Sequence, residues 1–125
     1  MKQAVYLVAV DNGMVSVLQD ESGYSLPGGL CGEKDSHELF LMRFCLEKTG
    51  YDISVEDFIC EERQGDTVEY YYSGSLIDAV TDGKPFPAIP LTQLTRLTSP
   101  AQRRATEECL AMMRSDAQGS EDADL

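Results

Sequence analysis

The order of strand-like and helix-like segments constrains the fold of this chain more than any other feature. Residues 3–10 and 14–19 are rich in valine and flank Asn12-Gly13, a dipeptide that forms tight turns, so they predict a hairpin. Residues 54–63 and 67–78 predict a second hairpin in the same way. One helix-like segment follows each hairpin. This alternation predicts an α+β domain in which helices cover a mixed β-sheet.

Capping residues bound the first helix, which is expected at about residues 36–49. Asp35 is a good N-cap, and Glu38 three residues later completes a capping box. Gly50 supplies the left-handed conformation with which many helices end. Apolar side chains surround most of this helix, so we expect it to pack on more than one side.

The last helix begins after Ser99, an N-cap that precedes Pro100 at the first helical position. The stripe that contains Met112 and Met113 is compatible with core packing and equally with a homodimer. From Ser115 onward the chain is acidic and poor in large apolar residues. We therefore expect one domain, residues 1–114, and a disordered acidic tail, residues 115–125.

Length and charge exclude several classes of protein. The 125 residues suffice for one domain with its own core. The formal net charge of −12 argues against binding of a nucleic-acid polymer or an anionic membrane, because both use clusters of Lys and Arg. No apolar run is long enough to span a membrane, and the N-terminal run ends in a turn, as a strand does and a signal peptide does not. The four cysteines are therefore expected to be reduced thiols of a cytoplasmic protein.

A glycine-rich segment followed by the first helix carries the clearest motif. Leu26-Pro27-Gly28-Gly29 precedes a loop, then come Asp35 after five residues and Arg43 after seven more. Without a gap, the segment from Gly29 to Tyr51 resembles the signature of the Nudix hydrolases. In that signature Gly and Glu are followed by Arg-Glu-aliphatic-x-Glu-Glu-x-Gly-aliphatic. The resemblance implies a Nudix-like α/β/α sandwich whose helix binds Mg²⁺ or Mn²⁺ and hydrolyses nucleoside diphosphate derivatives.

Two of the three acidic positions on the signature's helix are not acidic here. In the family, carboxylates at i, i+3 and i+4 share one helix face and hold a divalent cation through oxygen atoms. This chain has Phe44, Glu47 and Lys48 there, so the formal charge of the trio is zero. At about 4 Å, Lys48 and a divalent ion would repel each other by roughly 8 kcal/mol at an effective dielectric near 20, before screening. Asp35 keeps the charge of the first Glu position on a shorter side chain.

Two functions remain open from the sequence. The first is a binding or regulatory module for a small nucleotide or phosphate ligand with little or no hydrolase activity. In this module Gly28, Gly29 and Lys48 contact phosphate, and Arg43 pairs with Glu47 on the helix.

The alternative is a divalent-metal-dependent pyrophosphohydrolase of a nucleoside diphosphate derivative. By the resemblance, Glu47 would then be a metal ligand or general base, with Asp35 as a further ligand and Arg43 to orient it. Such a site needs additional carboxylates from outside the signature. The candidates are Glu33, Glu38, Glu61, Glu62 and Glu69.

Three other features have a simpler structural explanation. His37, the only histidine, is expected to be exposed at the start of the helix, and no nucleophile motif accompanies it. Cys31 is expected to be a plain loop thiol rather than a reactive one. Tyr70 and Tyr72 should lie on one face of a strand and Tyr71 on the other, which favours sheet packing over stacking on a base.

Overall fold

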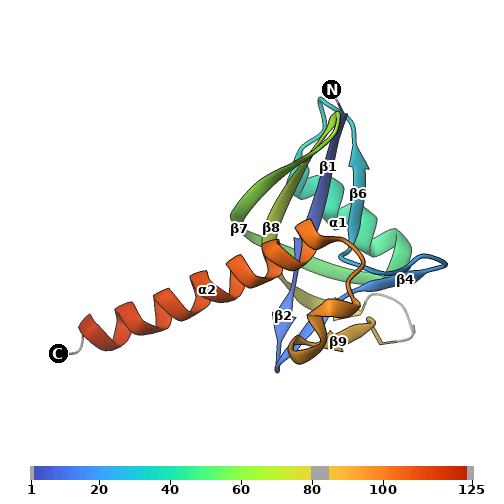
Figure 1. Ribbon diagram of the computed structural model, residues 1–125. Helices are drawn as coiled ribbons and strands as arrows, with labels where there is room; N and C mark the ends of the chain where they lie inside the picture. The colour runs from blue at the N-terminus through green and yellow to red at the C-terminus, as the bar shows by residue number, and fades with distance from the viewer. Residues whose placement is uncertain (1, 80–84, 124–125) are drawn as a thin grey trace.

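A mixed four-stranded sheet with a helix on each face forms the body of the protein (Figure 1). The computed structural model describes residues 2–79 and 85–123, with only the backbone for residues 78, 79 and 116–123. The strand order is β6-β1-β8-β7, in which β1 is parallel to β8 and the other neighbours are antiparallel. The strands are β1 (Lys2–Val8), β6 (Gly28–Cys31), β7 (Tyr51–Gln64) and β8 (Thr67–Ala79). The expected α+β sandwich with a mixed sheet is confirmed.

Shorter strands build two small sheets beside the central one. The hairpin predicted around Asn12-Gly13 is present, with both turn residues in the left-handed region at φ 52° and φ 73°. The strand expected over residues 3–10 is divided, because its end pairs in the small sheet β2-β3-β9 instead. The remaining elements are β2 (Val10–Asp11), β3 (Met14–Ser16), β4 (Leu18–Asp20), β5 (Gly23–Ser25), β9 (Ala88–Pro90) and the 3₁₀ helix η1 (Leu91–Arg96).

Alternate residues of β1 supply two separate cores. Val5 and Leu7 pack in the core beneath helix α1 (His37–Thr49). Val8 packs in the core beneath helix α2 (Pro100–Ala123), together with Tyr71. Tyr72 packs against the α1 core, so the predicted separation of the tyrosines onto two faces is confirmed.

The start of α1 differs from the prediction by one residue. Ser36, not Asp35, is the N-cap, and its Oγ accepts a hydrogen bond from the Leu39 N–H at 3.3 Å. The Asp35 carboxylate instead accepts a hydrogen bond from the Gly32 N–H at 3.2 Å. The Asp35–Glu38 capping box is therefore wrong, whereas Gly50 ends the helix at φ 77° as predicted.

The outer face of α1 is open in the described part of the chain. Leu39, Met42 and Leu46 are exposed by 60%, 37% and 41% of their surface. Only Leu41 and Cys45 of this helix are buried. The expectation that α1 packs on more than one side is therefore wrong, because the sheet covers a single side of it.

Helix α2 begins as predicted, with the Gln102 N–H donating to the Ser99 Oγ at 3.3 Å. It continues past the expected boundary at residue 114 to Ala123, through a segment without proline, and projects from the body in Figure 1. The division into a domain of residues 1–114 and a tail stays a prediction. Met113 is 49% exposed, so core packing explains only part of the methionine stripe, and a homodimer also stays a prediction.

No helix within residues 2–79 and 85–123 is long and apolar enough to cross a membrane.

Candidate functional site

The expected metal-binding trio lies on α1, where it presents only one carboxylate. Glu47 and Lys48 are exposed. Phe44 is half-buried, packs against the α1 core, and has its ring centroid 5.9 Å from that of Phe40. The phenyl ring of Phe44 has no oxygen atom with which to bind a metal ion. Of the trio, Phe44 therefore serves packing, and Glu47 is the one carboxylate on this part of the helix surface.

Asp35 and Arg43 both lie close enough to Cys31 to affect its thiol. Burial raises the pKa of the Cys31 thiol, the Asp35 carboxylate raises that pKa further, and Arg43 opposes it. The raised pKa favours the neutral thiol and agrees with the expected unreactive cysteine. Cys31 ends strand β6, however, and is not in a loop. The predicted Arg43–Glu47 pair is not formed. The one ion pair among the described residues joins Arg104 to Glu62 at 3.0 Å.

In the part of the chain that the structure describes, carboxylates from outside the trio do not gather into a metal site. Glu62 and Glu69 face each other across β7 and β8. Glu69 accepts a hydrogen bond from the Tyr71 hydroxyl at 3.0 Å, on the face of the sheet opposite α1. In residues 2–79 and 85–123, no three His, Cys, Asp or Glu side chains are grouped so that they could hold a metal ion. The donor set present here therefore does not fit Mg²⁺ or Mn²⁺, which require several oxygen ligands.

The two glycines expected to approach a phosphate belong to a strand instead of a loop. Gly28 pairs with Tyr6 and Gly29 with Val5 in the β6–β1 ladder. Gly28 has φ 143°, and a Cβ there would overlap the Val5 carbonyl oxygen. A Cβ on Gly29 would have no heavy atom within 4 Å. Close packing on β1 thus explains Gly28, while space remains open beside Gly29.

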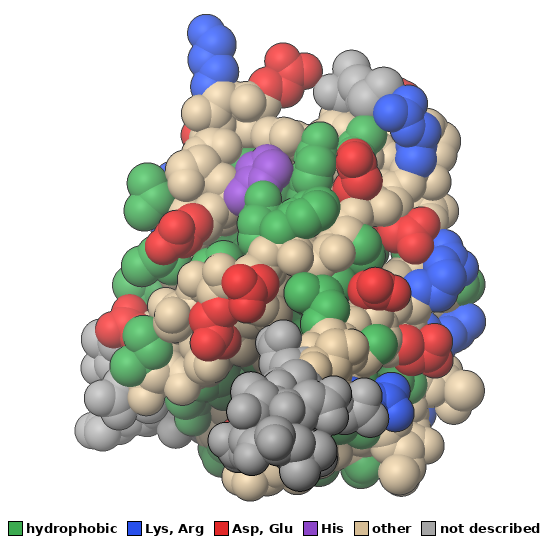
Figure 2. Space-filling view, turned by 90° about the vertical axis from the view of Figure 1, so that its left-hand side faces the viewer, with side chains coloured by type: hydrophobic (Ala, Val, Ile, Leu, Met, Phe, Trp, Pro, Cys, Tyr) green, Lys and Arg blue, Asp and Glu red, His purple; other side chains and the backbone are tan. Residues whose placement is uncertain are grey.

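The environment of the single histidine, His37, also differs from the prediction. His37 is half-buried, with Nδ1 2.8 Å from the Tyr72 hydroxyl and Nε2 3.3 Å from the Gln3 Oε1. Its ring centroid lies 4.7 Å from that of Tyr70. In Figure 2 the histidine of the chain lies against hydrophobic side chains. The prediction of an exposed histidine is wrong, because Tyr70 and Tyr72 reach from β8 to the start of α1.

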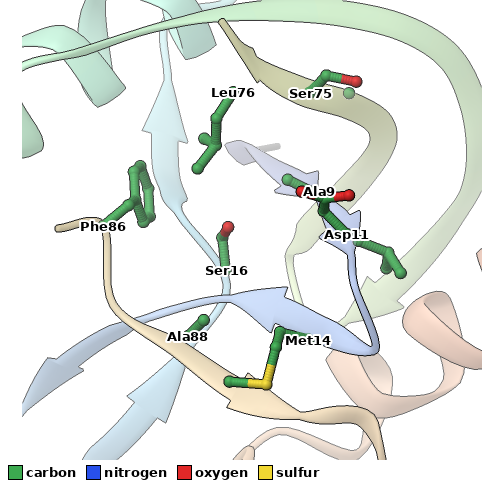
Figure 3. Close-up of a pocket in the computed structure, with 10 residues that line it drawn as sticks. Ala9, Asp11, Met14, Ser16, Ser75, Leu76, Phe86 and Ala88 are labelled. Carbon is green, nitrogen blue, oxygen red and sulfur yellow. The ribbon is translucent and has the colours of Figure 1, made fainter. Parts of the chain in front are cut away.

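A pocket of about 380 Å³ lies between the central sheet and the small β2-β3-β9 sheet. Figure 3 shows Phe86, Leu76 and Ser16 pointing into this space from three sides. The lining residues are Ala9, Val10, Asp11, Met14, Ser16, Gly74, Ser75, Leu76, Phe86 and Ala88. Glu47, Asp35, Arg43, Lys48, Gly28 and Gly29 are not among them. We call this space the inter-sheet pocket.

The inter-sheet pocket combines apolar walls with a few oxygen atoms. Met14, Leu76 and Phe86 supply the apolar surface. Ser16 is buried and Asp11 is exposed, so a hydroxyl and a carboxylate are available to a ligand. Ser75 is already engaged, because its Oγ donates to the Glu56 Oε1 at 2.9 Å. Such a lining suits a flat apolar ring with N–H donors at its edge.

Sequence reasoning missed this pocket for a clear reason. Its lining comes from four separate stretches of the chain, around Ala9, Ser16, Ser75 and Phe86. Most of these residues are apolar and are typical of a core. Only the pairing of β2, β3 and β9 beside β8 shows that they surround a cavity.

No protein-family model matches this sequence, and no curated protein matches it. Solved structures do match. An ADP-ribose pyrophosphatase from Streptococcus suis is similar over 90% of this chain and 92% of its own, with TM-score 0.73 and 16% identity. A Nudix hydrolase from Nitrosomonas europaea is similar over 88% of both chains, with TM-score 0.74 and 13% identity.

A third solved structure, a MutT Nudix hydrolase from Burkholderia pseudomallei, is similar over 86% of this chain and 96% of its own. Its TM-score is 0.66 and its identity is 16%. The chain therefore has the fold of the Nudix hydrolases, as the motif from Gly29 to Tyr51 implies. At these identities the similarity shows the fold alone, and fold does not establish activity.

Proposed function

We propose that this Nudix-fold protein binds a small nucleotide-like ligand in the inter-sheet pocket and has little or no hydrolase activity. The observation that carries the proposal is the surface of α1, where a half-buried phenyl ring and an ammonium group flank a single carboxylate, Glu47. A hydrolase of this fold needs a cluster of acids on that surface. The inter-sheet pocket, in contrast, could bind a nucleobase without a metal ion.

The ring-binding part of the proposal follows from the pocket's lining. Met14, Leu76 and Phe86 would contact the faces of a nucleobase, and dispersion and desolvation would favour its entry. The Asp11 carboxylate and the Ser16 hydroxyl would accept hydrogen bonds from its N–H groups.

Binding of the ligand's phosphate is less favoured, because no Lys or Arg among the described residues lines the pocket and the formal net charge is −12. Lys48 does not line the pocket, so we propose its exposed ammonium group, a point charge in place of a metal, as a separate phosphate contact on α1. Long-range repulsion then predicts modest affinity that improves as salt screens it. The four free cysteines support a reducing, cytoplasmic setting for this role.

Calorimetry with ADP, GDP, UDP and ADP-ribose in EDTA tests binding without metal. We expect Leu76→Trp, which fills the pocket, to weaken binding of the best ligand at least about tenfold. Ile77→Trp is the matched control, because Ile77 is the next residue of β8, does not line the pocket and is 62% exposed. Equal affinity in both variants, or no binding of any nucleotide, would refute the proposed pocket.

Turnover of the same nucleotides with Mg²⁺ or Mn²⁺ separates the two functions. We expect no product above background for the wild-type protein. Metal-dependent turnover that collapses in Glu47→Gln would instead establish the alternative, a pyrophosphohydrolase that uses Glu47 as metal ligand or general base.

A further inference from the structure

A second pocket, of about 310 Å³, lies between α2 and the central sheet. It shares Val10, Gly74 and Ser75 with the inter-sheet pocket, but its other residues come from α2, β1, β7 and β8. These other residues are Val8, Glu56, Asp57, Ser73, Cys109, Met112 and Met113. We call it the α2 pocket.

One part of the lining of the α2 pocket is apolar and adaptable. Val8 and Val10 come from β1 and β2, and Met112 and Met113 come from α2. Met113 leaves 49% of its surface exposed at this site. Unbranched thioether side chains adjust to different apolar partners, so exposed methionines beside a cavity are typical of surfaces that bind peptides.

The polar part of the α2 pocket carries only negative charge. Glu56 and Asp57 are exposed residues of its lining, and no Lys or Arg of residues 2–79 and 85–115 lines it. The Ser75 Oγ donates to the Glu56 Oε1 at 2.9 Å, which holds this carboxylate in place. Both acids also act on the interior of the pocket, since they raise the pKa of Cys109 beyond the effect of its burial.

The acidic character continues beyond the pocket along the chain. Helix α2 extends past Met113 to Ala123 and projects from the body (Figure 1). This extension contains Asp116, Glu121 and Asp122 against one basic residue, Arg114. The face of the molecule in Figure 2 has acidic side chains across its middle, with Lys and Arg toward its top and right-hand side.

We propose that the α2 pocket is the docking site for a basic, amphipathic segment of a partner protein. An apolar side chain of the segment would enter between Met112 and Met113, and an adjacent Lys or Arg would pair with Glu56 and Asp57. Charge complementarity selects this occupant, because the described lining has two carboxylates, which repel anionic ligands, and no basic group to hold them. The proposed contacts, Met112, Met113, Glu56 and Asp57, do not line the inter-sheet pocket, so the proposal does not rest on nucleotide binding.

Fluorescence anisotropy with a labelled helical peptide of Leu and Lys, one apolar face and one basic face, tests the charge requirement. We expect measurable binding that weakens about tenfold in the double variant Glu56→Gln/Asp57→Asn. The control Glu21→Gln/Asp66→Asn makes the same charge change at two exposed residues outside the pocket. Equal weakening in the control, or no binding of the peptide up to 1 mM, would overturn the proposal.

Methyl NMR of the methionines tests the location. We expect the peptide to shift the Met112 and Met113 methyl signals and to leave those of Met14, in the inter-sheet pocket, and Met42, on α1, unchanged. A bound nucleotide should shift the Met14 methyl signal and leave those of Met112 and Met113 unchanged. The two proposals can therefore fail separately.

Apolar anchoring has its own test. Met113→Ser should weaken peptide binding several-fold, whereas Met42→Ser should not. Both methionines are exposed, so neither change should unfold the protein. Peptide shifts confined to Met42, or a concentration-dependent dimer that closes the pocket and is lost in Met113→Ser, would show a different occupant and overturn the proposal.

Discussion

Replacing Lys48 by Glu tests the prediction that the charge of the α1 surface opposes binding of a divalent ion. Lys48 is exposed in the last turn of α1, one residue after Glu47. The variant changes the charge of the trio by two units and adds a second carboxylate on the same helix face. Because the side chain is exposed, the expected cost in stability is small, about 0.5 kcal/mol from the loss of a cation at the helix C-terminus.

The expected gain in metal affinity follows from Coulomb's law. Repulsion of roughly 8 kcal/mol between an ammonium group and a divalent ion at 4 Å falls to about a tenth once the side chain moves and water screens it. Removing about 0.8 kcal/mol of repulsion and adding similar attraction amounts to about 1.6 kcal/mol, or somewhat more than tenfold in affinity. Adding Phe44→Glu completes three carboxylates. It also removes a ring that packs against the α1 core near Phe40, at a cost of about 2 kcal/mol.

Calorimetric titration with Mn²⁺ and Mg²⁺ measures this gain. We expect the wild-type protein to bind neither ion below about millimolar, Lys48→Glu to bind more tightly, and the double variant to bind more tightly still. Lys34→Glu is the matched control, because Lys34 is exposed, lies outside α1 and gives the same change in net charge. Adding Glu47→Gln to Lys48→Glu should abolish the gain.

Two results would refute the reasoning. One is wild-type binding of either ion well below millimolar, which would mean that other oxygen atoms already form a site. The other is an equal gain in Lys34→Glu, which would show that net charge rather than the α1 surface controls the affinity.

Three further predictions concern stability, measured by urea denaturation. Gly28→Ala should cost at least about 3 kcal/mol, because its Cβ would meet the Val5 carbonyl oxygen, whereas Gly29→Ala should change stability by less than about 0.5 kcal/mol; equal effects would contradict the packing explanation. Gln102→Ala should cost about 1–3 kcal/mol, because it leaves the buried Leu26 N–H, now 2.7 Å from the Gln102 Oε1, without an acceptor; a neutral effect would show that another group replaces it. Burial raises the pKa of Glu69 above its ordinary value of 4.5, so its stabilising contribution is present below that pH and is lost as pH rises through the raised pKa. Glu69→Gln should therefore stabilise the protein at pH 7 and lose this advantage below pH 4.5; a pH-independent effect would contradict this sign.

Local signals account for the correct parts of the sequence analysis. Asn12-Gly13 forms its hairpin, Gly50 ends α1, and Ser99 caps α2. Each signal acts within a few residues through positive φ or a side-chain hydrogen bond to a nearby N–H, so neighbouring residues suffice to predict it. Asp35 shows the limit, because Ser36 is an equally good cap and the hydrogen bond of Asp35 to Gly32 decides between them.

Contacts between distant segments account for the errors. Gly28 lies in an edge strand rather than a loop because it packs closely on β1. His37 is half-buried because two tyrosines of β8 reach it. The residues of one segment do not show which strand will lie beside it.

The sequence by itself determined the Nudix-like arrangement and the chemical content of the α1 surface. Turns, helix caps and side-chain charges are local properties, so each can be predicted from a few neighbouring residues. Only the tertiary structure decided that Glu62 and Glu69 face away from α1 and that residues from separate segments line two pockets. The physical reason is that cavities and ligand sites arise from the packing of elements far apart in the chain. Their positions depend on the sheet order β6-β1-β8-β7 rather than on any single segment.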